Sequence, residues 1–146
     1  MKKIMMLLLM LLLFSCNNNE GKQEIIEGIN WNMSKQEIKK ILSNKILVEE
    51  REDELVYRRI KMNVNEIGLD EEMNIVGFSF KNNKLQIIGG AIIRENNYEN
   101  SEFLRDIIKN CNANQEPEGK LNNYSCDLYE QGNSLMLDIR YYSSKD

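Results

Sequence analysis

The first run of hydrophobic positions in the chain is unbroken. It extends from Ile4 to Phe14, follows Lys2 and Lys3, and contains no charged residue. As a helix this run would rise about 16 Å, whereas the hydrocarbon core of a bilayer is about 30 Å thick. We therefore interpret residues 1–15 as a cleaved signal peptide and not as a membrane span.

The end of this run is the sequence Leu13-Phe14-Ser15-Cys16. It resembles the lipobox of bacterial lipoproteins, which has an aliphatic residue three positions before an invariant cysteine and a small residue one position before it. The resemblance implies cleavage before Cys16 and a diacylglycerol on its sulfur. Two or three acyl chains anchor a protein stably in a membrane. The alternative is an ordinary secretory signal with an incidental cysteine.

The residues after Cys16 are polar. Residues 17–23 contain no apolar side chain, and such a composition does not bury enough surface to fold. We expect residues 16–24 to form a lipidated cysteine and a flexible tether. In bacteria with two membranes, an Asp directly after the lipidated cysteine usually retains the protein in the inner membrane. Asn17 therefore favours the outer membrane, if the organism has one.

From residue 31 onward the spacing of apolar residues becomes helical. Ser34 and Glu37 have the spacing of a capping box, in which each side chain bonds the backbone N–H of the other residue. Met33 and Ile38 flank the box as a hydrophobic staple. We expect the helix to end near Ser43 and to bury three side chains: Ile38, Ile41 and Leu42.

Strand patterns follow this helix. A short strand is expected at residues 46–48, and even positions then predict one apolar face interrupted by Arg58: Val56, Ile60, Met62 and Val64. Residues 75–80 and 85–88 form a hairpin across Asn82-Asn83, because Asn tolerates the positive φ angles of a tight turn. In the returning strand, Gly89-Gly90 predicts a bulge or a sharp twist.

A second helical pattern covers about residues 98–110, with one apolar stripe: Leu104, Ile107, Ile108 and Cys111. A last hairpin pairs residues 124–128 with residues 135–141 across Gly132-Asn133. The order is helix, strands, helix, strands, and tight hairpins require antiparallel pairing. We therefore predict an α+β fold with an antiparallel sheet of about five to six strands. Two helices pack on one face, in a single domain of residues 25–146.

The helix start and the first hairpin also carry a resemblance. Residues 31–38 read aromatic-x-Met-Ser-x-x-Glu-aliphatic, and the hairpin closes at residues 82–85, Asn-Asn-Lys-Leu. This combination looks like small envelope proteins of bacteria. Their layout is similar to that of β-lactamase inhibitor protein and of the small accessory lipoprotein of outer-membrane barrel assembly. The resemblance implies a protein-binding or scaffolding role and no catalytic residue.

Charge narrows the range of partners. The chain has 19 basic and 23 acidic residues and a net charge of −4, which becomes −6 when Lys2 and Lys3 leave with the signal peptide. A negative domain without a basic stripe is repelled by phosphate backbones. Nucleic acid is therefore not an expected partner.

The chain contains no histidine, which removes the commonest general base and the Ser-His and Cys-His nucleophile systems. It also contains no phosphate-binding loop and no nucleophile elbow. We predict no enzymatic activity, no cofactor and no metal site. Two acidic runs, residues 49–54 and 70–72, lack the alternating spacing of a calcium loop, and we interpret them as solvated faces. A hydrolase that uses carboxylates alone is the disfavoured alternative.

Three aromatic residues are candidates for either core or interface. Trp31 is the only tryptophan, and Tyr141 and Tyr142 are neighbours near the C-terminus. We expect Trp31 and Tyr141 to be core residues, with an interface role for Trp31 as the alternative. Because successive side chains in a strand point to opposite faces, Tyr142 is the better surface candidate.

Besides Cys16, the chain has two cysteines, Cys111 and Cys126. Cys111 ends the apolar stripe of the second helix, and Cys126 is expected to face the same core from a strand. An even pair in an oxidising compartment suggests a disulfide. Two buried, reduced thiols that act as small hydrophobes are the alternative.

These observations favour a membrane-anchored, non-enzymatic lipoprotein of the cell envelope. It would be attached to the membrane through lipid on Cys16 and would bind another envelope protein through one sheet face or an edge strand. A specialised form is an immunity or inhibitor protein, whose acidity would complement a basic toxin or enzyme.

Overall fold

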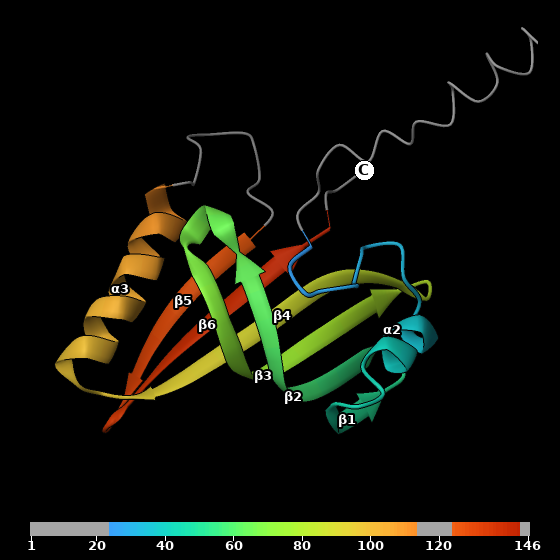
Figure 1. The fold of residues 1–146 in the computed structure, drawn as a ribbon, viewed down its shortest axis with the longest axis horizontal. Helices are drawn as coiled ribbons and strands as arrows, with labels where there is room; N and C mark the ends of the chain where they lie inside the picture. The colour runs from blue at the N-terminus through green and yellow to red at the C-terminus, as the bar shows by residue number, and fades with distance from the viewer. Residues whose placement is uncertain (1–23, 114–123, 144–146) are drawn as a thin grey trace, which may run out of the picture.

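The fold is seen in a computed structural model, which describes residues 24–113 and 124–143 (Figure 1). Its elements in chain order are helix α2 (Lys35–Ile41), strands β1 (Ile46–Arg51) and β2 (Glu54–Val64), the 3-10 turn η1 (Asn65–Ile67), strands β3 (Leu69–Lys81) and β4 (Lys84–Glu95), helix α3 (Tyr98–Ala113), and strands β5 (Tyr124–Gln131) and β6 (Ser134–Tyr142).

The strands form one sheet of six in the order β1-β2-β3-β4-β6-β5, and every neighbouring pair is antiparallel. Four of the five pairs are adjacent in sequence, whereas β4 and β6 become neighbours through the connection that contains α3. The predicted α+β class, with an antiparallel sheet and two α-helices among the described residues, is confirmed.

Helix α2 begins where the capping pattern predicts. The backbone N–H of Ser34 donates to Glu37 Oε2 (2.7 Å), and the N–H of Glu37 donates to Ser34 Oγ (3.4 Å). Ile38 and Leu42 are buried as expected, but Ile41 is 39% exposed. The prediction that Ile41 belongs to the core is wrong, because the helix ends at that residue and presents a narrower stripe to the sheet.

Along β2, which forms a long hairpin with β3, the buried side chains switch from one set of alternate positions to the other. Leu55 and Tyr57 are buried, and Val56 between them is only half-buried. Beyond the change, the buried positions are Ile60, Met62 and Val64. The change occurs at Arg59, whose φ of 58° interrupts the regular alternation of a strand. The predicted face is therefore correct after Arg59 and wrong at Val56.

The hairpin of β3 and β4 closes at Asn82 and Asn83, with φ angles of 53° and 58°. These are the positive values expected at a tight turn. Its register shifts between Ser79 and Phe80, so the bulge lies near the turn and not at Gly89-Gly90. Gly90 instead allows close packing in the core, because a Cβ there would come within 2.8 Å of the Met73 methyl carbon and would also contact Met62.

The sheet diverges beyond the pair Ile75–Ala91, which is the last register pair of β3 and β4 on that side. From there β4 continues against β6, whereas the start of β3 pairs with β2, as Figure 1 shows. An ion pair between Arg94 and Glu71 (3.1 Å) joins β4 and β3 across the divergence.

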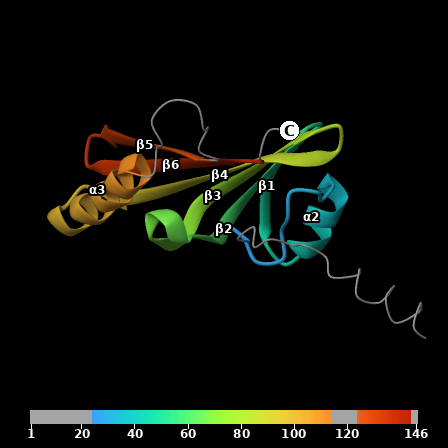
Figure 2. The same ribbon diagram turned by 90° about the horizontal axis from the view of Figure 1, so that it is seen from above.

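Buried apolar side chains form one cluster. Ile38 of α2 and Leu104 and Ile107 of α3 belong to it, although Figure 2 shows the two helices near opposite ends of the sheet. All strands except β1 contribute to the cluster; every residue of β1 is exposed.

Candidate interaction surfaces

An aromatic stack occupies one end of the core. Trp31 stacks on Tyr141 with ring centroids 5.8 Å apart, and Tyr141 stacks on Tyr124 at 5.7 Å. The backbone N–H of Leu85 donates to the carbonyl of Met33 (3.0 Å), which fixes the segment that carries Trp31. Burial raises the pKa of Tyr141 above its ordinary value. Trp31 and Tyr141 are half-buried, so this stack is mainly a packing feature.

Tyr142 lies on the other face of the sheet. It is opposite Ile87 in the register of β4 and β6, whereas Tyr141 is opposite the buried Ile88. Tyr142 is half-buried. The structure therefore does not bring Trp31 and Tyr142 together. Trp31 packs on Tyr141, whereas Tyr142 points to the opposite face of β6.

The face that carries Tyr142 also carries exposed apolar side chains. Ile75, Ile93 and Tyr129 are 39%, 43% and 48% exposed. In the sheet register Ile75 is opposite Ala91, and Met136 is opposite both Ile93 and Tyr129. We call these five residues the outer strip. It crosses β3, β4, β6 and β5.

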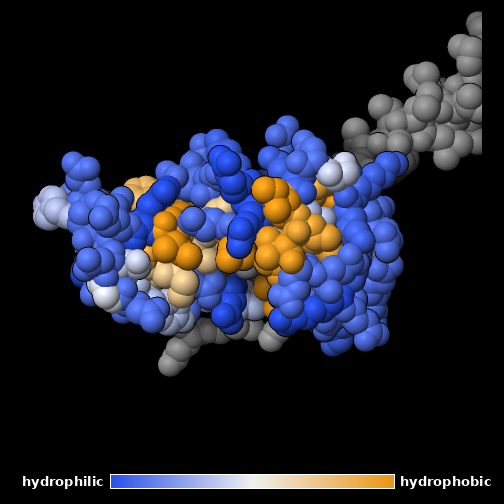
Figure 3. Space-filling view, turned by 90° about the horizontal axis from the view of Figure 1, so that it is seen from below, coloured by the Kyte–Doolittle hydropathy of each residue, from blue (hydrophilic) through white to orange (hydrophobic). Residues whose placement is uncertain are grey.

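Strand β1 also exposes apolar side chains. Ile46, Leu47 and Val48 are 59%, 38% and 45% exposed, and Ile46 and Leu47 point to opposite faces of the sheet. Figure 3 looks at the molecule from below the view of Figure 1, the side on which β1 lies, and shows hydrophobic surface in two areas separated by hydrophilic side chains.

The acidic runs are occupied by ion pairs. Glu50 is bonded by Lys39 (2.7 Å) and Lys35 (3.2 Å), and these hydrogen bonds hold its pKa below the ordinary value. Glu49 and Glu54 contact Arg51 at 2.7 and 3.2 Å.

In the second acidic run, three partners come from other strands. Asp70, Glu71 and Glu72 pair with Lys61, Arg94 and Arg59 at 3.0, 3.1 and 2.9 Å. Among the described residues no charged or polar side chain is buried, and no group of three or more acidic or cysteine side chains is placed to hold a metal ion. Six carboxylates of the two runs are therefore partners in ion pairs: Glu49, Glu50, Glu54, Asp70, Glu71 and Glu72.

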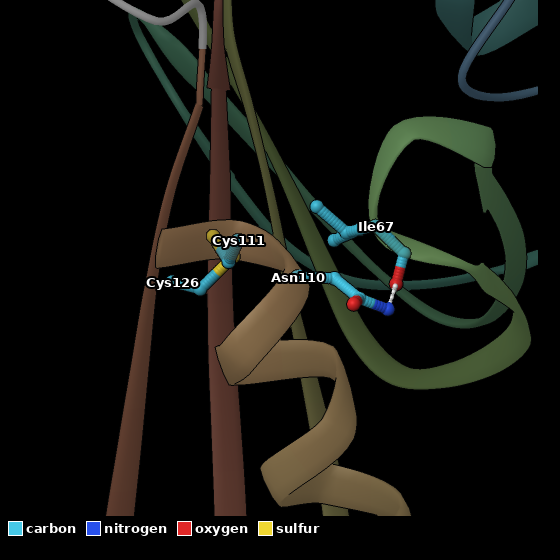
Figure 4. Close-up of a disulfide and its surroundings, with 4 residues drawn as sticks. All are labelled: Ile67, Asn110, Cys111 and Cys126. Carbon is cyan, nitrogen blue, oxygen red and sulfur yellow. Dashed lines mark hydrogen bonds between the residues drawn. A yellow bond between two sulfur atoms is a disulfide. The ribbon is translucent and has the colours of Figure 1, made fainter. Parts of the chain in front are cut away.

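A disulfide joins Cys111, at the end of α3, to Cys126 of β5 (Figure 4). The Cα atoms are 6.3 Å apart, within the usual range for such bonds. Next to it, Asn110 Nδ2 donates to the carbonyl of Ile67 (3.3 Å), so the same turn of α3 contacts both β5 and η1.

Cys16 and the predicted signal peptide lie outside the described residues. Within the described part of the chain, neither helix has the length and apolar character needed to cross a membrane.

Sequence reasoning missed the outer strip and the exposure of β1. The alternation of residues 75–80 indicates that Ile75 faces away from Val76, but apolar residues on both faces of a strand also fit a fully covered strand. Exposure is therefore the deciding observation.

The chain matches no family model, no curated protein and no solved structure.

Proposed function

We propose that this chain is a lipid-anchored protein of the bacterial cell envelope that binds another protein without catalysis, through the outer strip. The observation that carries the proposal is the exposure of Ile75, Ile93 and Tyr129 on one face of the sheet.

The strip is continuous, which distinguishes it from scattered apolar residues. Residues directly opposite in an antiparallel pair have Cβ atoms about 5 Å apart. Ile93, Met136 and Tyr129 are opposite one another in turn, and Ile93 follows Ala91 at the two-residue spacing of one face. Single exposed apolar residues are normal on a protein surface, whereas a connected patch is typical of an interaction site.

The surface beside the outer strip is recessed, because two glycines without side chains lie there. Gly77 and Gly89 are opposite each other in the register of β3 and β4. A Cβ added at Gly77 would find only Glu54 Oε1 at 3.7 Å, and one added at Gly89 would find Arg140 Cγ and a backbone oxygen at 3.9 Å. A side chain of a partner can therefore approach the backbone of the sheet here.

Charged residues border the apolar side chains. Asp138 is opposite Ala91 and is bonded by Arg140 (3.1 Å), and Asp127 is opposite Asp138 on β5. An apolar centre with a polar rim is the usual composition of a protein interface. Basic groups border the strip as well, since Arg58 is opposite Ile75, so a partner would present polar groups of both signs around an apolar centre.

The proposal includes the arrangement of the helices and the anchor. We take both helices to pack on the inner face, since Ile38 and Leu104 belong to the same core, and this leaves the outer strip for a partner. The lipid on Cys16 and the tether of residues 16–24 would keep that face close to a membrane. The outer membrane is the proposed location in a bacterium that has one.

Crosslinking in the producing cell tests the binding surface. A photoreactive amino acid replaces Ile93 in the full chain, and a matched probe replaces Tyr98, which is 79% exposed but lies outside the strip. We expect one discrete adduct with a different protein at position 93 and none at position 98. Adding Ile75→Asp should lower the yield about tenfold, because the interface must desolvate the new charge. Equal adducts at both positions, or a yield that Ile75→Asp leaves unchanged, would overturn the proposal.

The anchor is tested separately with Cys16→Ala. The variant should lose its lipid and leave the membrane pellet after a salt wash, whereas the unchanged chain stays in it. If the processed variant remains in the pellet, a protein partner and not lipid holds the chain at the membrane.

A further inference from the structure

One arginine of the sheet has no acidic partner. The chain has six arginines, and the structure describes all of them. Five of them contact a carboxylate at 2.7–3.2 Å: Arg51, Arg59, Arg94, Arg105 and Arg140. Arg58 is exposed and contacts no carboxylate among the described residues. In a chain with more acidic than basic residues, such an arginine is the exception.

The register places Arg58 on the face of the outer strip. Because Tyr57 is buried, its neighbour Arg58 points to the opposite face of β2. Arg58 is opposite Ile46 of β1 and Ile75 of β3, which are 59% and 39% exposed. Ile75 belongs to the outer strip. The arginine therefore lies between two exposed isoleucines and adjoins the strip.

The acidic residues on this part of the face are already occupied. Glu49 is opposite Val56, which precedes Arg58 on the same face of β2, and Glu54 precedes Val56 in turn. Arg51 contacts both carboxylates, at 2.7 and 3.2 Å. The guanidinium of Arg58 can therefore accept a carboxylate from another molecule without displacing an ion pair of this chain.

A single carboxylate is the group that this surroundings fits best. The planar guanidinium donates two parallel hydrogen bonds to one carboxylate. Its chain neighbour Arg59 is paired with Glu72 (2.9 Å) and adds no second free cation. Nucleic acids and anionic membrane surfaces require a cluster of basic residues, whereas one cation matches one acidic side chain. Isoleucines on both sides would exclude water from the pair once a partner covers them, which strengthens it.

From this arrangement we infer that Arg58 determines the specificity of the outer strip by binding one carboxylate of the partner protein. The inference rests on the function proposed for the strip. The partner places its carboxylate on Arg58 and an apolar side chain on Ile75 and Ala91, which are opposite each other. Ile46 covers the other side of the ion pair, so the exposed strand β1 contributes to the same surface.

Charge variants at position 58 test the inference in the producing cell, with the photoreactive residue at position 93 of the full chain as the reporter. Arg58→Glu should lower the adduct yield by about tenfold or more, because two carboxylates then face each other. Arg58→Lys keeps the charge and should retain more of the yield than the neutral Arg58→Gln. Lys109→Glu, the same charge change at an exposed position of α3, is the control and should leave the yield unchanged. A yield that Arg58→Glu does not change, or that falls equally with Lys109→Glu, overturns the inference.

A carbodiimide identifies the group that faces position 58. The reagent activates a carboxyl group, and a lysine amine in contact with it displaces the activated oxygen to form an amide bond. In membranes from the producing cells, Arg58→Lys should be joined at residue 58 to the protein that the probe at position 93 captures. Mass spectrometry locates the bond, and the unchanged chain, which has no amine at this position, gives the background. If Arg58→Lys keeps the adduct at position 93 but forms no amide bond at residue 58, the inference is overturned.

Failure here is distinguishable from failure of the proposed function. An adduct at position 93 that depends on Ile75 but not on Arg58 would keep the outer strip as a binding surface and remove Arg58 from its specificity. Absence of a discrete adduct at position 93 in the unchanged background would overturn both.

Discussion

The two edges of the sheet are held in different ways. At one edge, β5 is joined to α3 by the disulfide Cys111–Cys126 and by the ion pair of Arg105 with Glu130 (3.2 Å), and its residue Tyr124 is buried. At the other edge, β1 buries no residue, and ion pairs of Glu50 with Lys35 and Lys39 connect it to α2.

The difference shows what an edge strand requires. A covalent bond and buried contacts keep β5 in place without help from another molecule. Exposed ion pairs contribute little to stability, so β1 depends on its hydrogen bonds with β2. The register of β1 on β2 also shifts between Leu47 and Glu49, and such an irregularity makes an edge strand a poorer template for a further strand.

Among the changes that test this comparison of the two edges, loss of the disulfide should have the largest effect on the free energy of unfolding. Cys126→Ala removes a bond that closes 15 residues, and the chain-entropy model gives about 3 kcal/mol for such a loop. We expect the free energy of unfolding to fall by about this amount in urea denaturation. Reduction of the unchanged chain should have the same effect. Hydrogen exchange should increase in β5 more than in β1; an equal increase in both strands would show that the edges are not independent.

The second prediction concerns the strand between the edges. Gly90→Ala would place a methyl group against Met62 and Met73, and overpacking of this kind costs about 1–3 kcal/mol. Gly89→Ala is the matched control, because its nearest neighbours are 3.9 Å away. Thermal unfolding should show a clear loss of stability for Gly90→Ala alone. Similar losses in both variants would mean that backbone conformation, and not the two methionines, requires glycine.

A smaller effect is expected at the N-terminus of α2, near β1. Ser34→Ala removes the acceptor for the N–H of Glu37 and should cost about 1 kcal/mol. Ser43→Ala, at an exposed position beyond the helix, serves as the control. The urea midpoint should shift for Ser34→Ala and stay constant for Ser43→Ala. Equal midpoints would show that the cap adds nothing to stability.

The smallest effect is the pH dependence at β1. Hydrogen bonds from Lys39 and Lys35 lower the pKa of Glu50 from its ordinary value of 4.5. A carboxylate with a lowered pKa stabilises the fold above the ordinary value, and this contribution disappears as the pH falls through the lowered pKa. Glu50→Gln should therefore be slightly less stable than the unchanged chain at neutral pH and equal to it in acid.

The control is Glu52→Gln, in the turn that follows β1, at a residue that makes no ion pair among the described residues. Its stability curve should run parallel to that of the unchanged chain across the pH range. If Glu50→Gln also runs parallel, the two lysine contacts do not contribute to stability.

Local signals in the sequence determined much of the fold. The capping box predicted the start of α2, paired asparagines predicted the turn after β3, and the stripe of Leu104 and Ile107 predicted α3. These features depend on residues within a few positions of one another. For that reason they can be derived without knowing what lies across the sheet.

Tertiary structure decided which face of each strand is covered. Alternation alone placed Val56 with Ile60, but the left-handed conformation of Arg59 exchanges the faces between them. The exposure of Ile75 and of all of β1 likewise depends on which elements pack nearby, and no pattern within those strands reveals it. Burial is a property of contacts between distant segments, so the outer strip and the exposed side chains of β1 emerge only when the strands are placed side by side.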